Sequence, residues 1–181
     1  TYLVRGDSLG STPGAGVANV FASGALGLSG GGNITGLANI STRPDMVGDV
    51  SATGTGTGFL TYTAGSGFRV LGANETLGTI NNMFTTTANL AKSANETFTT
   101  ATVATVTLES GGGLTGFNSG SILTIPSIGI LAKTGNTGFS GGQINPGASS
   151  MFIHTLGNLT VDSYVLGNGI TKDGAGNLSF N

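Results

Sequence analysis

Short runs of β-prone residues recur along this chain, and each run is closed by Gly, Asn or Ser. Dense turn signals separate the runs, for example Gly111-Gly112-Gly113 and Asn168-Gly169, and these residues tolerate the positive φ angles of tight turns. Repeated short strands between tight turns predict an all-β chain. The clearest runs span residues 58–63, 98–108, 120–125, 128–132, 151–155 and 158–165.

Composition excludes several other classes of protein. Of the 181 residues, 34 are Gly, only 8% are charged, and the formal net charge is −2. Gly is a poor helix former and Thr is a weak one, which argues against a helical bundle. The six Lys and Arg form no basic patch for nucleic acid. Without Cys there is neither a disulfide framework nor a thiolate metal site.

The chain carries no signal for a membrane-spanning segment. No apolar run reaches the roughly 20 residues that a spanning helix needs. No basic region followed by an apolar stretch opens the chain at Thr1, so we expect any signal peptide to be absent or already removed. Light charge, with Thr, Ser, Asn and Gly in its place, is typical of secreted β proteins. The sequence therefore predicts an extracellular or cell-surface location.

Alternation and a short repeat both indicate stacked strands. Residues 104–108 alternate Ala or Val or Leu with Thr, which predicts an apolar face inward and a Thr face outward toward solvent. A motif of the form Gly-x-(Leu/Ile)-(Thr/Ser) also recurs, and its spacing is compatible with solenoid coils of about 20 residues or more. The sequence predicts a β-solenoid with Gly and Asn at its corners. The motif begins at Gly32, Gly112, Gly157 and Gly176.

Two stretches fit this pattern less well. Residues 1–57 are rich in Gly, Ala and Thr and are predicted to be an N-terminal arm or the first coils, with 8–32 as the loosest part. Residues 58–181 are predicted to form the solenoid domain, and one continuous domain over 1–181 is the alternative. Within 74–93 the apolar spacing is near-helical, which predicts a short helix or an irregular loop. The residues in that spacing are Leu77, Ile80, Phe84 and Leu90.

Several motifs of the C-terminal half occur in a characteristic order. Residues 169–180 read GITKDGAGNLSF, 123–131 read LTIPSIGIL, and 139–144 read FSGGQI; MFIH at 151–154 precedes GNLTV at 157–161. In this order they resemble the autotransporter-associated β-strand repeat of large secreted or surface-displayed bacterial proteins. The resemblance is good over 108–180 and fair over 59–75. It implies a right-handed parallel β-helix, export, and no enzyme activity shared across the family.

Candidate catalytic residues are few. His154 is the single His, so a Ser-His-Asp triad would have to use it, with Asp162 as a candidate acid. The pattern Gly-x-Ser-x-Gly surrounds Ser8, Ser29 and Ser140, but a nucleophile elbow also needs a strand before the Ser and a helix after it. No helical pattern follows any of the three, so we interpret them as turn residues.

Acidic residues are also scattered. A glycosidase needs two converging carboxylates, and the closest pair in sequence, Asp45 and Asp49, lies in a predicted loop. The tripeptide at 5–7 (Arg-Gly-Asp) matches an integrin-type ligand, but three residues match readily by chance. The sequence therefore predicts no enzymatic activity, no catalytic, cofactor-binding or metal site, and no cofactor. The eight carboxylates are Asp7, Asp45, Asp49, Glu75, Glu96, Glu109, Asp162 and Asp173.

A structural function follows from these expectations. A solenoid has two open ends whose unpaired strand edges can hydrogen-bond to another strand. We expect a charged cap at neither end. The sequence predicts an exported structural protein that associates with itself, or continues in a longer parent chain, to build an extracellular filament, stalk or surface scaffold. The alternative is a cell-surface adhesin or binding module that contacts glycans or other cells through loops in 36–58.

Overall fold

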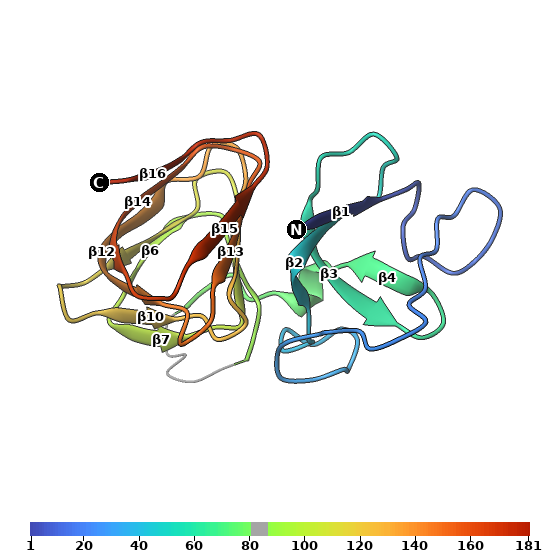
Figure 1. The fold of residues 1–181 in the computed structure, drawn as a ribbon, viewed down its shortest axis with the longest axis horizontal. Coiled ribbons are helices and arrows are strands. Elements are labelled where there is room, and N and C mark those ends of the chain that lie inside the picture. Colours follow the sequence, from blue (N-terminus) through green and yellow to red (C-terminus); the bar gives the residue numbers. More distant parts are fainter. Residues whose placement is uncertain (81–86) are drawn as a thin grey trace.

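Two parallel sheets run through the C-terminal part of the molecule and share one hydrophobic core (Figure 1). The computed structural model describes residues 1–80 and 87–181. About 45% of the chain is strand and 2% is helical, and the parallel strands stack as a β-solenoid of about 4 turns. The predicted all-β, parallel β-helix fold is thereby confirmed.

Each coil contributes one strand to the five-stranded sheet and either one or two strands to the seven-stranded sheet. The five-stranded sheet has the order β15-β13-β11-β8-β5, and the seven-stranded sheet has the order β16-β14-β12-β10-β7, with β9 pairing both β12 and β6. The five-stranded sheet comprises β5 (Leu90–Lys92), β8 (Thr105–Leu108), β11 (Gly129–Ala132), β13 (Met151–Thr155) and β15 (Ile170–Asp173). The seven-stranded sheet comprises β6 (Asn95–Phe98), β7 (Thr100–Thr102), β9 (Gly113–Gly116), β10 (Ile122–Thr124), β12 (Gly138–Asn145), β14 (Leu159–Val165) and β16 (Leu178–Phe180).

Apolar side chains of successive coils stack in register inside the solenoid. Each pairs with the equivalent residue of the next coil and is almost completely buried, which stabilises the fold by about 1.5–3 kcal/mol for each large side chain. Backbone pairing between coils satisfies the polar main chain, so the thin core needs no charged surface. The column of the five-stranded sheet contains Leu90, Val106, Ile130 and Ile153, and that of the seven-stranded sheet contains Leu114, Phe139 and Val161.

The first part of the chain forms a separate small sheet, which we call the N-terminal module (residues 1–76). Its strands have the order β1-β2-β3-β4, with β1 parallel to β2 and the other pairs antiparallel. The segment 8–32 is not a loose arm: Leu9 is buried against Leu60 and Phe68, and Ala18, Ala22 and Leu26 pack onto the same cluster. The strands are β1 (Tyr2–Arg5), β2 (Arg43–Asp49), β3 (Gly58–Thr63) and β4 (Gly67–Val70).

The predicted domain boundary at residue 58 is wrong. Residues 58–70 form β3 and β4, which pair antiparallel within the N-terminal module rather than with any solenoid strand. The first contact of solenoid type is the parallel bridge between Leu77 and Leu90. The strand runs were recognisable, but nothing in a single run shows whether its partner lies nearby or one coil away.

The segment 74–93 combines several elements. A 3₁₀ turn, η1 (Ala73–Glu75), is followed by the bridge at Leu77, and β5 begins at Leu90. Residues 81–86, which include Phe84 of the predicted near-helical spacing, lie outside the described residues. Among the described residues of this segment, the only helical element is the single 3₁₀ turn η1.

The N-terminal module covers the outer face of the five-stranded sheet. Val47 and Phe59 of the module form a buried cluster with Leu131 of β11. The Phe59 ring also lies against Gly129, where an added Cβ would come within 3.0 Å of the ring carbons. Glycine at this position therefore lets the module approach the solenoid closely. Strand β2 contacts both β11 and β13.

This cover corrects the prediction of a solvated Thr face on β8. Thr105 and Thr107 do point away from the solenoid core, but both are buried, at 0% and 6% exposure. The Thr105 hydroxyl donates a hydrogen bond of 2.8 Å to Asn89 Oδ1. Alternation correctly separated the two faces of the strand, but it could not show that a second module covers the outer one.

Candidate functional site

The last coil of the solenoid has open strand edges. In the part of the chain that the structure describes, strand β15 pairs only with β13, and β16 pairs only with β14. Phe180 continues the core column above Val161 yet is 49% exposed, and Ile170 at the start of β15 is 41% exposed. Among the described residues, the hydrophobic core and both sheets thus end at a surface that offers unpaired backbone groups beside apolar side chains.

The first coil ends differently, in a buried ion pair. Lys92 and Glu96 occupy the register positions that Leu108 and Leu114 hold in the next coil, and their side chains pair with each other. Lys92 Nζ also donates to the carbonyl oxygen of Gly78. These contacts close the first coil with charge, so the prediction that neither end carries a charged cap is wrong for this end.

Glu96 is held by several donors. The Thr79 hydroxyl donates to Oε1 at 2.7 Å, and the Ile80 amide donates to Oε2 at 2.9 Å. Burial alone would raise the pKa of the carboxyl, but the hydrogen bonds from Lys92, Ile80 and Thr79 outweigh it and hold the pKa below its ordinary value. Glu96 therefore stays ionised, which keeps the cap charged.

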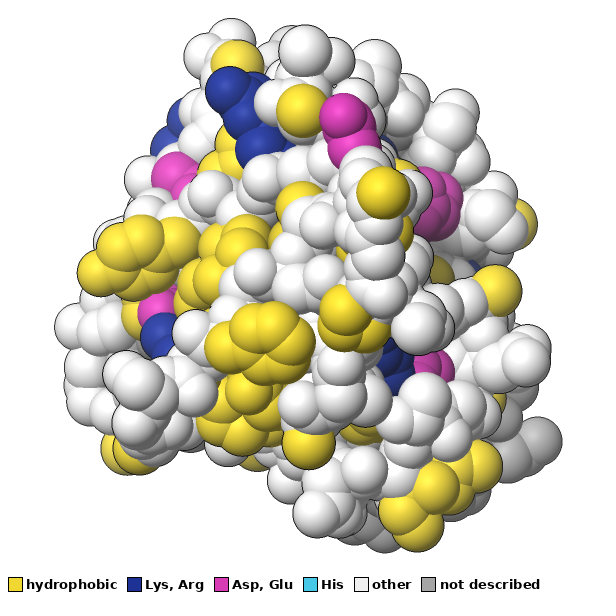
Figure 2. Space-filling view, turned by 90° about the vertical axis from the view of Figure 1, so that its right-hand side faces the viewer, with side chains coloured by type: hydrophobic (Ala, Val, Ile, Leu, Met, Phe, Trp, Pro, Cys, Tyr) yellow, Lys and Arg dark blue, Asp and Glu magenta, His cyan; other side chains and the backbone are white. Residues whose placement is uncertain are grey.

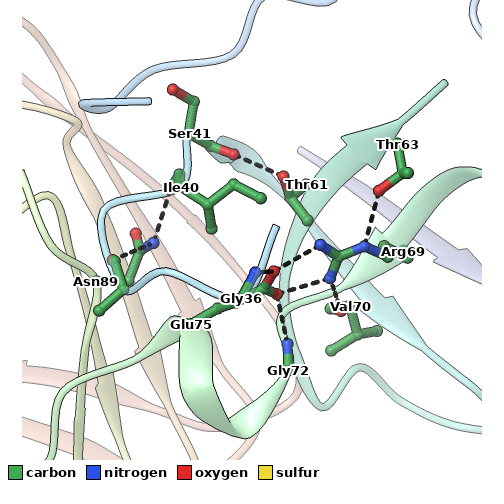
Figure 3. Close-up of polar contacts among 11 residues, drawn as sticks. Gly36, Ile40, Ser41, Thr61, Thr63, Arg69, Val70, Gly72, Glu75 and Asn89 are labelled. Atoms are coloured by element: carbon green, nitrogen blue, oxygen red, sulfur yellow. Dashed lines mark hydrogen bonds and ion pairs between the residues drawn. The ribbon is translucent and has the colours of Figure 1, made fainter. Parts of the chain in front are cut away.

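A second ion pair, between Arg69 and Glu75, clamps the N-terminal module (Figure 3). The guanidinium donates to both carboxylate oxygens at 2.6 Å, and its Nε donates to the Thr63 hydroxyl at 2.9 Å. The amides of Gly36 and Gly72 each donate to Glu75 at 2.8 Å. One carboxylate therefore joins β4, the turn η1 and the loop that contains Gly36. This clamp had no sequence signal, because Arg69 and Glu75 belong to no recognised motif.

Asn89 fastens the same loop to the first coils. Its side-chain amide donates to the carbonyl oxygens of Ala38 and Ile40 at 3.1 and 2.9 Å, while its Oδ1 accepts from Thr105. Figure 3 shows that the Asn89 contacts and the Arg69–Glu75 pair lie on either side of this loop. Together the two sets of contacts hold residues 36–40, the first part of the predicted adhesin loops at 36–58, against the rest of the fold.

We expect acid to weaken this clamp. Burial would raise the pKa of Glu75, but the hydrogen bonds from Arg69, Gly36 and Gly72 lower it to about 2, from an ordinary value of 4.5. Stability from a lowered pKa is fully present above the unfolded value and is lost as the pH falls toward the folded one. The free energy of unfolding should therefore fall by about 2–3 kcal/mol between pH 4.5 and 2, measured by chemical denaturation across this range.

The Glu75→Gln variant should show a flatter pH profile than the wild type over that window. Glu109→Gln is the matched control, because Glu109 pairs with Lys133 at a more exposed position. Parallel profiles for the wild type and Glu75→Gln would contradict the assignment.

The structure places His154 at the junction rather than in a catalytic triad. Its Nε2 lies 2.8 Å from the Pro44 carbonyl oxygen. Because that oxygen only accepts, Nε2 carries a hydrogen and is not free to take a proton from a Ser hydroxyl. Its Nδ1 lies 2.7 Å from Asp173 Oδ1, at ion-pair distance but without hydrogen-bond alignment. The acid beside His154 is thus Asp173 and not the predicted candidate Asp162.

The three Ser candidates are not gathered around His154. Ser8 adopts a positive φ of 54° in the turn after β1, and Ser29 forms an isolated bridge with Thr42. The Ser140 hydroxyl lies 3.0 Å from that of Thr115 on the outer side of the seven-stranded sheet. Each Ser therefore has a local structural role.

The remaining acidic candidates have separate partners. Asp45 forms a bidentate pair with Arg43, whose hydrogen bonds hold the pKa of Asp45 below its ordinary value against the opposing effect of burial. Asp49 accepts from the amides of Ser51 and Gly56 and thereby shapes the loop after β2. Among the described residues, no group of three or more His, Cys, Asp or Glu side chains could hold a metal ion.

The charged residues of the Arg-Gly-Asp tripeptide also have structural partners. Arg5 donates to the Gly54 carbonyl oxygen at 2.9 Å, and Asp7 accepts from the Ala52 amide at 3.1 Å. Gly6 between them is buried. The two charged side chains thus tie the end of β1 to the loop at 51–54.

Over the described residues the fold is a β-solenoid with the N-terminal module packed on one face, a charged cap on the first coil and, on the last coil, strands that pair on one side. Comparison with protein-family models, curated proteins and solved structures found no match to this chain. In the described part of the chain, no helix is long and apolar enough to cross a membrane.

Proposed function

We propose that this chain is an exported structural protein whose solenoid contributes to an extracellular filament, stalk or cell-surface scaffold through strand pairing at its last coil. The observation that carries the proposal is the open edge of β15 and β16, where Ile170 and Phe180 are 41% and 49% exposed. An unpaired edge beside apolar side chains is a template for another strand. The partner is a second copy of the chain or a further coil of a longer parent chain.

Charge supports β16 as the pairing edge. Strand β15 carries Lys172 and Asp173, and charge on an edge strand opposes pairing. Strand β16, Leu178–Phe180, carries no charged residue. The ion pair of Lys92 and Glu96 covers the opposite end of the core, so the last coil is the end that we propose for strand pairing. The resemblance to autotransporter-associated repeats supports export and surface display.

The face of the N-terminal module offers less for such pairing. Figure 2 shows hydrophobic side chains there in separate groups among uncharged atoms, with a few charged side chains between them. Scattered exposed hydrophobic residues are normal for a soluble protein. They support no specific contact comparable with the edge of β16.

The test is the association state of Phe180→Lys. We expect wild-type chains to associate in sedimentation and electron microscopy, and Phe180→Lys to shift them toward monomers, because Lys adds charge to the pairing edge. Phe117→Lys is the matched control, since Phe117 is 70% exposed and lies away from this edge. Monomeric wild type at high concentration, with the amides of β15 and β16 protected from hydrogen exchange, would contradict the proposal.

A further inference from the structure

A groove crosses the outer face of the seven-stranded sheet, and the proposed scaffold function does not use it. It spans three successive coils, at β9, β12 and β14, which is two strand spacings or about 10 Å. Its lining comprises Gly116, Asn118, Ser119, Gly141, Gly142, Gln143, Asp162 and Tyr164.

A bulge in β12 makes the hollow. Ser140 pairs with Asp162 and Gln143 pairs with Tyr164, so two residues of β12 oppose the single residue Ser163 of β14. The two bulge residues, Gly141 and Gly142, have φ angles of 63° and 61°, which favour glycine. The Ser163 hydroxyl donates to the Gly141 carbonyl oxygen at 2.7 Å and fixes the bulge from below.

The floor of the groove is bare backbone, and its packing excludes side chains. A Cβ on Gly116 would lie 2.7 Å from the Gly142 Cα, and a Cβ on Gly141 would lie 2.9 Å from the Gly116 carbonyl oxygen. At Gly142 an added Cβ would come within 2.8 Å of the Ser121 carbonyl oxygen. The hollow is therefore built into the solenoid and does not depend on side-chain rotamers.

The walls combine one aromatic ring with several polar groups. Tyr164 is 68% exposed beside the groove. Asp162 Oδ1 accepts from Asn181 at 2.7 Å, and Gln143 Nε2 donates to the Ser119 carbonyl oxygen at 3.3 Å. These contacts orient the two side chains, while Asp162 Oδ2 and Gln143 Oε1 have no hydrogen-bond partner among the described residues.

This chemistry selects a neutral ligand that has both hydroxyl groups and an apolar face. The lining contains one carboxylate and no Lys or Arg, which disfavours anions. Below the groove β12 is paired on both sides, with β9 and β14, so an extended peptide finds no free edge on that strand. A pyranose ring meets the conditions: its C–H face stacks on an aromatic ring, and its hydroxyls reach fixed polar groups.

From these observations we infer that the groove is a binding site for a neutral oligosaccharide, with Tyr164 as the stacking platform and Asp162 and Gln143 as hydroxyl acceptors. The glycine floor lets the sugar approach the backbone. The site differs from the loops at 36–58 that the sequence had suggested for an adhesin.

The test titrates the purified chain with cellohexaose, maltohexaose and chitohexaose by NMR and calorimetry. At least one should bind, and Tyr164→Ala should weaken its binding about tenfold or more, while Tyr164→Phe keeps it within a few-fold. Tyr2→Ala is the control, because Tyr2 is an exposed aromatic residue of the N-terminal module.

Three results would overturn the inference. One is the absence of binding by every hexasaccharide at millimolar concentration. Another is binding that Tyr164→Ala leaves unchanged. The last is preferential binding of a sulfated hexasaccharide, because Asp162 should repel it. Folding of each variant is checked by its circular dichroism spectrum.

Discussion

Replacing Arg69 with Met should lower the free energy of unfolding by about 3–5 kcal/mol, because the change leaves a buried carboxylate without its cation. Glu75 is 2% exposed and receives two hydrogen bonds of 2.6 Å from the Arg69 guanidinium. The same carboxylate also holds the amides of Gly36 and Gly72. Urea denaturation at neutral pH, followed by circular dichroism, measures the loss.

A double variant separates the buried charge from the lost contacts. Arg69→Met/Glu75→Gln removes the charge, and the Gln oxygen still accepts from the Gly36 or Gly72 amide, so we expect it to lose clearly less stability than Arg69→Met alone. Arg5→Met is the matched control, since Arg5 is exposed and its effect should stay within about 0.5 kcal/mol. Equal losses of stability for the single and double variants would show that the unpaired charge of Glu75 is not the cause of the loss.

The strands were largely predictable because their signals are local. The runs at 58–63 and 151–155 coincide with β3 and β13, and the run at 128–132 contains β11. Each combines β-branched or aromatic residues with a glycine or polar turn at its end, and both signals act within a few residues. The stacking of the strands as coils was predicted from the spacing of the repeat motif, and the parallel β-helix was implied by the resemblance to the autotransporter-associated repeat.

The repeat motif was only partly informative. Its last two copies are in register, since Leu159 pairs with Leu178. The copy at Gly112 is displaced, because its Leu114 stacks with Phe139 and Val161 rather than with Leu159. The copy at Gly32 lies in the N-terminal module, where Gly32 forms a bridge with Ile40. Corners of different length shift the register between coils, and a sequence motif alone does not reveal this shift.

Contacts between distant segments carried no sequence signal. The Lys92–Glu96 cap occupies positions that are apolar in the next coil, and it is recognisable only once the register is known. The groove beside Tyr164 depends on the bulge in β12 and on glycines from two different coils. In the sequence these glycines were turn residues and the exposed Tyr164 belonged to an ordinary strand. Sites of this kind arise from the stacking of coils, so they follow from the fold and not from a motif.

Replacing Phe59 with Ala should destabilise the protein by about 3–5 kcal/mol, the usual range for removing a buried aromatic side chain. Phe59 is 1% exposed and packs with Val47 and Leu131 across the junction of module and solenoid. Its ring also makes an edge contact with the His154 ring, with centroids 5.7 Å apart. Phe117→Ala is the control, since an exposed Phe should contribute within about 0.5 kcal/mol.

Hydrogen exchange on the Phe59→Ala variant distinguishes two domains from one continuous domain. The Phe59 side chain packs at the interface between the N-terminal module and the solenoid and not in the solenoid core. In the variant, amides of β2 and β3 should therefore lose protection while those of β12 and β14 keep it. Equal loss throughout would mean that residues 1–181 unfold as one cooperative unit. A loss of stability no larger than that of Phe117→Ala would mean that the junction contributes nothing. The first outcome makes the module a separable cover on the solenoid.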